Sequence, residues 1–153
     1  MISVPRQLLI QAVFIAINAI FAGLEMAMVS LSTTKLKMLE EEGDKAAVKL
    51  LKMLENPAGF LSAIQVAISL SGFLGSAFAA DSLSEPLTDW LISLGLTGIS
   101  YSTLNSISVV IITLILTVVT IIFGELVPKR VAQQKSYEVA KIFMKLLQVI
   151  STV

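Results

Sequence analysis

Three long apolar segments constrain the fold of this chain more than any other feature of its sequence. Residues 8–32 carry one charged side chain, Glu25, residues 58–80 carry none, and residues 99–125 carry none before Glu125. A helix of roughly 20 apolar residues crosses the hydrocarbon core of a bilayer. Only 14% of the 153 residues are charged, against about a quarter in a typical soluble domain. The sequence therefore predicts an all-α membrane protein with three transmembrane helices.

The lysine and arginine residues lie mainly in two blocks, and their positions predict the topology. Of the 11, five lie between the first and second apolar segments and five follow the third, whereas residues 81–98 contain none. Short loops rich in lysine and arginine stay on the cytoplasmic side of a membrane. We therefore expect a multi-pass protein of the cell membrane with its N-terminus outside, residues 81–98 as an outer loop and its C-terminus in the cytoplasm.

Several residue types that catalysis often uses are missing from the chain. The sequence contains no cysteine and no histidine, which excludes disulfides and thiolate metal sites and removes the commonest general base. It has no glycine-rich phosphate loop, and with a net charge of zero it has no excess of basic residues that would indicate nucleic-acid binding. We expect neither an enzyme nor a nucleic-acid-binding protein.

Two amphipathic stretches flank the apolar segments. Residues 33–57 predict helix with a break at Gly43 and a stop at Asn56-Pro57, and their charged faces are expected to be solvated. Residues 136–153 predict a second helix, which lies along the inner membrane surface or links to a following soluble domain. The sequence ends at Val153 without a stop signal, so we expect a piece of a longer protein.

Each apolar segment carries a stripe of polar or small residues at helical spacing, so that the three stripes are expected to converge on a common interior. The alternative is that such residues only pack membrane helices together. In chain order the stripes are Asn18, Ala22, Glu25 and Ser32; Ser62, Gln65, Ser69, Gly72 and Ser76; and Thr113, Thr117, Thr120 and Gly124.

Glu25 stands out because it lies about 15 Å along a helix from Lys35, near the middle of the membrane. An ionisable side chain at that depth costs at least about 2.5–3.5 kcal/mol and is a functional-site hypothesis by default. A structural role is the alternative. Asn18, one or two turns outward, is its expected hydrogen-bond partner.

The stretch FGELVPKR, residues 123–130, places a second carboxylate at the end of the third segment. Pro128 has no N–H, so the carbonyl of Gly124 loses its helical partner, and a glycine there lets another helix or an ion come close. A freed carbonyl beside Glu125 is the kind of oxygen cluster that hard cations bind. The alternative is a helix end at which Glu125 reaches the interface or pairs with Lys129.

Three stretches resemble the membrane domain of the CorC/CNNM family of magnesium transporters. They are FAGLEMAMVSLSTTKLKML, FLSAIQVAISLSGFLGSAFA and above all FGELVPKR, in the family's order, and the likeness covers nearly the whole chain. The resemblance implies three spans with an additional re-entrant or interfacial helix, a homodimer, and in each subunit one dehydrated Mg²⁺ held by oxygen ligands. It also implies a cytosolic pair of nucleotide-binding CBS modules and a C-terminal domain, which are absent from this chain.

Carried over position by position, the resemblance places the cation site on residues of all three spans. It assigns Glu125 and Gly124 in the third span, Ser69, Ser71 and Gly72 in the second, and the Gly23 position in the first. Many members have serine where this chain has Ala22 and asparagine where it has Gly72. Because Glu25 adds a carboxylate, the ligand set becomes more anionic.

These features lead to three hypotheses. The first is transport of a divalent cation, with Mg²⁺ as substrate and the sodium exchange that the resemblance implies. The second is export of a polyamine or another organic cation, which two facing carboxylates suit. The third is a membrane anchor and sensor that transports nothing. In each case we expect a lipid-embedded homodimer, with Gly72, Gly75, Ser76 and Ala79 permitting close approach of the second helix to its partner.

Overall fold

Three long helices form the body of the protein. The computed structural model describes residues 4–96 and 98–152. The first span is α1 (Val4–Ser30), the second is α4 (Pro57–Ser93), and the third runs without interruption through α5 (Tyr101–Ile121), the π-helical turn η1 (Ile122–Leu126) and α6 (Val127–Gln134). All three are long and apolar enough to cross a membrane. The predicted all-α membrane fold is confirmed.

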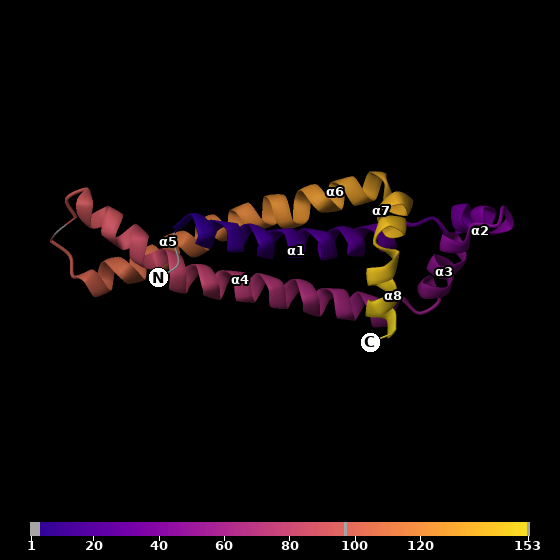
Figure 1. The fold of residues 1–153 in the computed structure, drawn as a ribbon, viewed down its shortest axis with the longest axis horizontal. Helices are drawn as coiled ribbons and strands as arrows, with labels where there is room; N and C mark the ends of the chain where they lie inside the picture. The colour runs from indigo at the N-terminus through magenta and orange to yellow at the C-terminus, as the bar shows by residue number, and fades with distance from the viewer. Residues whose placement is uncertain (1–3, 97, 153) are drawn as a thin grey trace.

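The shorter helices lie together at one end of the bundle. Figure 1 shows α1 running between α4 and α6, with α7 (Ser136–Ile142) and α8 (Met144–Thr152) crossing that end, and α2 (Thr33–Glu41) and α3 (Lys45–Leu54) extending beyond it. The main hydrophobic core lies here as well, where Leu24 and Met28 of α1 pack with Leu36, Leu50 and Leu147. Both basic blocks of the sequence are thus at the same end, as a common cytoplasmic location would require.

The helices are longer than the apolar segments suggested. Residues 81–98 were expected to be an outer loop, but α4 continues to Ser93 through Pro86. Its 37 residues span about 56 Å, more than the roughly 30 Å of a bilayer core. The outer part is held to α5 by Thr88, whose Oγ1 lies 2.9 Å from Ser108 Oγ and 3.2 Å from Asn105 Oδ1. Hydrophobicity identifies the membrane-crossing part of a helix, not its end.

Two other predicted boundaries are wrong. The first span ends at Ser30, and Ser32 is instead the N-cap of α2, accepting a hydrogen bond from the backbone N–H of Lys35. The expected single helix over residues 136–153 is broken at Phe143 into α7 and α8, and residue 153 lies outside the described part. The break turns Leu147 into the core, where its side chain is fully buried.

Asp44 connects the helical hairpin α2–α3 to α7. The charged faces of this region were expected only to be solvated, and the hairpin turns where predicted, at Gly43 with φ +91°. The carboxylate of Asp44 accepts hydrogen bonds from the N–H groups of Ala46 and Ala47 at the start of α3. It also accepts a hydrogen bond from the hydroxyl of Tyr137 in α7.

Lys35 and Lys141 place their Nζ atoms 5.9 and 5.8 Å from the centre of the Tyr137 ring, within the range of a cation–π interaction. The hydrogen bond from Tyr137 lowers the pKa of Asp44. Burial and Asp44 together raise the pKa of Tyr137 to about 12.

We expect Tyr137→Phe to loosen the α2–α3 hairpin, because it removes the hydroxyl that binds Asp44 and leaves the ring in place. Amide hydrogen exchange of residues 33–54 should be several-fold faster at neutral pH. Since the pKa of Asp44 is lowered in the folded protein, the contact stabilises the fold above the ordinary aspartate pKa and is lost as the pH falls below it. The difference in exchange rate between variant and parent should therefore shrink toward acidic pH. A difference that does not change with pH would contradict this account. Tyr101→Phe, at the opposite end, is the control.

Candidate functional site

The turn η1 frees a backbone carbonyl that α1 then binds. Pro128 cannot donate a backbone hydrogen bond to Gly124, and the N–H of Val127 reaches back five residues to the carbonyl of Ile122. The carbonyl oxygen of Gly124 accepts instead from Asn18 Nδ2 of α1, at 3.0 Å. The predicted freed carbonyl is confirmed, but the predicted helix break is a single π-helical turn within a continuous helix. Turns of this kind are frequent at functional sites.

Gly124 permits the close approach of α1 to the third span. A Cβ atom at this position would lie 3.0 Å from Asn18 Nδ2, 3.4 Å from Thr120 Cγ2 and 3.6 Å from the carbonyl oxygen of Ile15. Gly124 itself is buried. The predicted need for a glycine here is confirmed.

The two membrane carboxylates are both half-buried. Glu125 lies in η1, directly after Gly124, and within the described part of the chain it forms no ion pair with Lys129 or with any other residue. The expected hydrogen bond between Asn18 and Glu25 is wrong, because the amide of Asn18 is bound to Gly124 and is only 2% exposed. Both carboxylates are therefore free to receive a cation from outside the protein.

Some of the ligand positions expected from the resemblance lie near this carbonyl. Ser71 is buried and donates a hydrogen bond to the carbonyl of Phe14 at 3.2 Å. Ser71 and Gly72 line a cavity of about 10 Å³ together with Asn18 and Thr120. The helices α1, α4 and α5 all contribute to this cavity.

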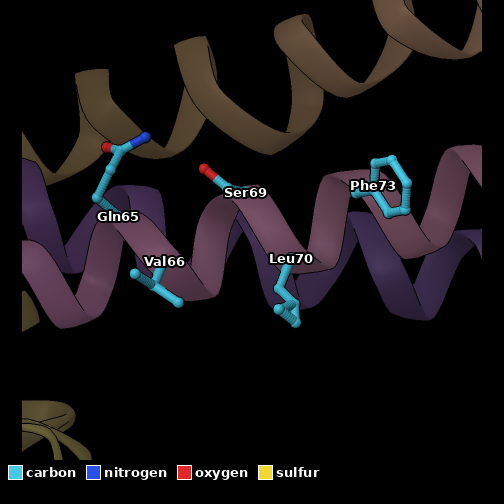
Figure 2. Close-up of a pocket in the computed structure, with 5 residues that line it drawn as sticks. All are labelled: Gln65, Val66, Ser69, Leu70 and Phe73. Carbon is cyan, nitrogen blue, oxygen red and sulfur yellow. The ribbon is translucent and has the colours of Figure 1, made fainter.

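Gly23 and Ser69 lie apart from that group. A Cβ atom at Gly23 would be 3.7 Å from both Cβ and the carbonyl oxygen of Pro128. Gly23 therefore lies where α1 packs against α6. Ser69 is exposed and lines, with Gln65 and Phe73, a shallow groove of about 420 Å³ on the outer side of α4. Figure 2 shows Gln65 and Ser69 on one edge of α4, and Val66 and Leu70 on the opposite edge. Ser69 is therefore not placed to join the others within one chain.

The expected convergence of the three polar stripes is thus correct only in part. Ser76 and Thr120 face the same cavity as Asn18. Thr113 and Thr117 are exposed, and each donates its hydroxyl to the carbonyl four residues earlier in its own helix.

The small-residue surface expected to contact a second copy is largely used within the chain. A Cβ atom at Gly75 would lie 3.3 Å from Phe14 Cβ of α1, and Ala79 is fully buried. Gly75 and Ala79 of α4 therefore bring α1 close, whereas a Cβ atom at Gly72 would meet nothing within 4 Å. The dimer contact on this surface stays a prediction.

The sequence reading missed two glutamines of α1. Gln7 and Gln11 are 6% and 4% exposed, and they extend the line of Asn18 and Glu25 toward the N-terminus. Residues 7, 11, 18 and 25 are spaced by four, seven and seven, which keeps them on one helix face. Their helical spacing from Asn18 could have been read from the sequence, but the predicted polar stripe of the first span began at Asn18.

Pro128→Ala tests whether the proline maintains the free carbonyl. Alanine supplies an N–H that can bind the Gly124 carbonyl and compete with Asn18, and it is a good helix former. We expect normal expression and folding but weaker cation binding, measured by titration calorimetry. Pro86→Ala, within α4 and outside this region, is the control. Unchanged affinity in the Pro128 variant would mean that the proline serves only the helix geometry.

The candidate donors are the carboxylate of Glu125 in η1 and the neutral oxygens around the cavity, which Glu125 itself does not line. Across residues 4–96 and 98–152, no group of three or more acidic side chains is placed to hold a metal ion. Carboxylate, hydroxyl and carbonyl oxygens are donors that suit a hard cation rather than a soft one. The arrangement favours binding of a cation from the alkali or alkaline-earth groups, or an organic ammonium group.

The sequence is similar to several bacterial proteins. Residues 9–153 match the family model of the cyclin M transmembrane N-terminal domain. The UPF0053 protein sll0260 of Synechocystis is 33% identical over 85% of this chain and 28% of its own length, and UPF0053 protein YhdP of Bacillus subtilis is 30% identical over 90% and 30%. The polyamine export protein of Haemophilus influenzae is 26% identical over 75% of this chain and 26% of its own length.

The chain spans roughly 30% of the length of these relatives. Its match to the family model begins within α1 and includes the other two membrane spans and the short helices α7 and α8. The chain is a multi-pass membrane protein and belongs to the family of the cyclin M transmembrane N-terminal domain.

Proposed function

We propose that this chain is the membrane domain of a cation transporter, that Mg²⁺ is its substrate and that Glu125 is the principal ligand. The observation that carries the proposal is the contact between Asn18 and the Gly124 carbonyl. It holds α1 against η1, an irregular turn that carries the Glu125 carboxylate, for which no ion pair is found among the described residues.

The charge of the ion is the physical reason for naming Glu125. Mg²⁺ takes near-octahedral oxygen coordination and dehydrates reluctantly, so a site within the membrane must supply compensating negative charge. Glu125 and Glu25 are the acidic residues of the predicted spans. Glu125 lies within the π-helical turn, where the Gly124 carbonyl is bound by Asn18 and not by its own helix, whereas Glu25 lies in regular helix. Glu125 therefore binds the ion, and Glu25 acts through water or in coupling to Na⁺ or protons.

Calorimetric titration of the purified chain with Mg²⁺, Ca²⁺ and a diamine tests the proposal. Saturable binding of Mg²⁺, lost in Glu125→Gln, supports it. A preference for the diamine supports a second candidate, export of a polyamine. That candidate is favoured by the name of the Haemophilus relative and by the presence of two membrane carboxylates. If none of the three ligands binds saturably, the domain is better described as a membrane anchor and sensor.

We also propose that the protein works as a homodimer, with the exposed face of α4 around Gln65, Ser69 and Phe73 at the contact. Phe73 is 75% exposed, and Gln65 and Ser69 are polar side chains exposed along a membrane span. Polar groups facing lipid are costly, and a second copy would cover them and bring Ser69 into the vicinity of a partner site.

Cysteine crosslinking in lipid tests the dimer, since the chain has no native cysteine. We expect Ser69→Cys to form a disulfide-linked dimer under mild oxidation, because the same residue of two copies meets at a two-fold contact. Val13→Cys, on the exposed face of α1, should remain monomeric under the same conditions. Monomer in both variants at every protein concentration would contradict the dimer.

A further inference from the structure

A basic cavity lies at the end of the bundle where the short helices meet α4. It has a volume of about 590 Å³ and is lined by residues of α3, of the start of α4 and of α8, namely Lys49, Lys52, Met53, Asn56, Gly59, Phe60 and Gln148. Figure 1 shows these three helices at the same end of the molecule. The cavity shares no lining residue with the small cavity beside Asn18, so what it binds does not depend on the proposed role of Glu125.

The charge in the lining of this basic cavity is positive. The charged residues that line it are two lysines, Lys49 and Lys52. Both are exposed, and neither forms an ion pair with another residue of the described part of the chain. They lie one turn apart in α3, at positions where side chains are neighbours on the helix surface and like charges repel. An anion bound between the two ammonium groups would remove this repulsion.

The start of α4 adds hydrogen-bond donors to the basic cavity. The side chain of Asn56 does not cap the helix, which begins at Pro57. The first N–H groups of a helix have no partner within the helix, and this end of a helix favours a negative group. Gly59 lines the cavity, and a Cβ atom there would meet nothing within 4 Å. The lysines thus have neutral donors beside them that also favour an anion.

The basic cavity also offers apolar surface, which narrows the choice of anion. Phe60 in its lining is only 3% exposed, and Met53 is half-buried. A small hydrated anion such as inorganic phosphate gains nothing from apolar surface. The volume of about 590 Å³ also lies within the roughly 300–1,000 Å³ of sites for larger molecules. The expected ligand therefore combines an anionic group with an apolar part.

The position of the basic cavity along the bundle identifies a ligand of this kind. Gly59 and Phe60 belong to the apolar segment 58–80, whereas Lys49 and Lys52 belong to the preceding basic block. The cavity therefore lies where the second span leaves the hydrocarbon, at the level of the lipid phosphates. Basic pockets beside membrane helices on the cytoplasmic side bind anionic lipid headgroups, and the topology predicted from the sequence places this end of the bundle on that side.

We propose that the basic cavity binds one anionic phospholipid, with the phosphate between Lys49 and Lys52 and the acyl chains along α4. Such a lipid would contact α3, α4 and α8 at once, because all three helices line the cavity. It would therefore hold the α2–α3 hairpin and α8 against the second span.

Thermal unfolding of the chain in a neutral detergent tests the proposal. The midpoint is followed while phosphatidylglycerol, or phosphatidylcholine with the same acyl chains, is added. A ligand that binds only the folded state raises the midpoint, so we expect a saturable rise with phosphatidylglycerol and none with phosphatidylcholine. Native mass spectrometry of the same samples should show one phosphatidylglycerol retained per chain.

Two double variants with the same loss of charge test the place of binding. Lys49→Gln with Lys52→Gln should weaken the apparent affinity for phosphatidylglycerol about tenfold or more. Lys37→Gln with Lys45→Gln is the matched control, because both residues are exposed lysines of the same hairpin and neither lines the basic cavity. The control should respond to phosphatidylglycerol like the parent. Lys49→Arg with Lys52→Arg keeps both charges and should keep the response.

Equal rises with phosphatidylglycerol and phosphatidylcholine would overturn the proposal, since the charge of the lipid would then not matter. An equal loss of response in the two glutamine variants would overturn it as well, because it would mean a general attraction of anionic lipid to the basic surface. Inorganic phosphate in place of lipid separates the two sources of a phosphate group. A saturable rise of the same size with phosphate alone would show that the cavity binds a free anion and not a lipid.

Discussion

Glu125→Gln is expected to abolish Mg²⁺ binding and transport while the protein still folds. The substitution keeps the shape of the side chain and removes its charge. Glu125 is half-buried and has no ion-pair partner in the described part of the chain, so its loss leaves no opposite charge unpaired. In the variant, however, a divalent ion that has given up its water within the membrane no longer meets the negative charge of Glu125 that would compensate it. We expect the affinity for Mg²⁺ to fall at least about 100-fold, measured by calorimetry, and uptake into proteoliposomes to stop.

Two further glutamate variants make this result interpretable. Glu55→Gln makes the same chemical change at an exposed position after α3 and should leave binding intact. Glu25→Gln should impair transport more than binding and should alter the dependence of transport on Na⁺ or pH. If the Glu125 variant binds and transports Mg²⁺ like the parent, the ion site lies elsewhere.

Gly124→Ala is expected to have the second-largest effect. The added methyl group would lie 3.0 Å from Asn18 Nδ2, closer than an amide nitrogen and a methyl carbon pack without strain. Because the Asn18 amide is bound to the Gly124 carbonyl, with Thr120 and the Ile15 carbonyl also in contact, the amide must give way by a few tenths of an ångström and weaken that hydrogen bond. We expect a loss of about 1–3 kcal/mol in the free energy of unfolding and a weaker site for Mg²⁺, since the hydrogen bond from Asn18 would be weakened.

Gly59→Ala provides the comparison for this variant. A Cβ atom at Gly59 meets nothing within 4 Å, and alanine stabilises a helix relative to glycine by roughly 0.5–1 kcal/mol. The free energy of unfolding, measured in detergent by circular dichroism, should therefore fall in the Gly124 variant and rise in the Gly59 variant. A Gly124 variant as stable as the parent and with normal Mg²⁺ affinity would show that the close approach of α1 to η1 is not needed.

The three spans and the helix starts followed from local features of the sequence. Pro57 begins α4, Gly43 separates α2 from α3, and Pro128 prevents a helical bond to Gly124. Each of these effects acts within a few residues of its cause, because hydrophobicity, proline sterics and the conformational freedom of glycine are local properties. The freed carbonyl could be predicted for the same reason.

The partner of that carbonyl could not be predicted in this way. Asn18 was assigned to Glu25, seven residues away on the same helix face, but it binds Gly124, 106 residues away in the sequence. Likewise, Tyr137 binds Asp44 across 93 residues, although the charges of the hairpin were expected only to be solvated. Helical spacing places residues on a common face, but it does not say which other helix that face meets.

The sequence by itself thus determined that the chain crosses the membrane three times as helix, carries two membrane carboxylates and has a glycine and a proline that make the turn around Glu125 irregular. Only the tertiary structure decided which polar groups meet. The rotation of each span about its axis and the close approach at Gly75 and Gly124 bring Gln11, Asn18 and Ser71 to one cavity and leave Ser69 outside it. The physical reason is that packing between helices depends on the shapes of both surfaces at once, whereas the stripe on each helix is a property of that helix alone.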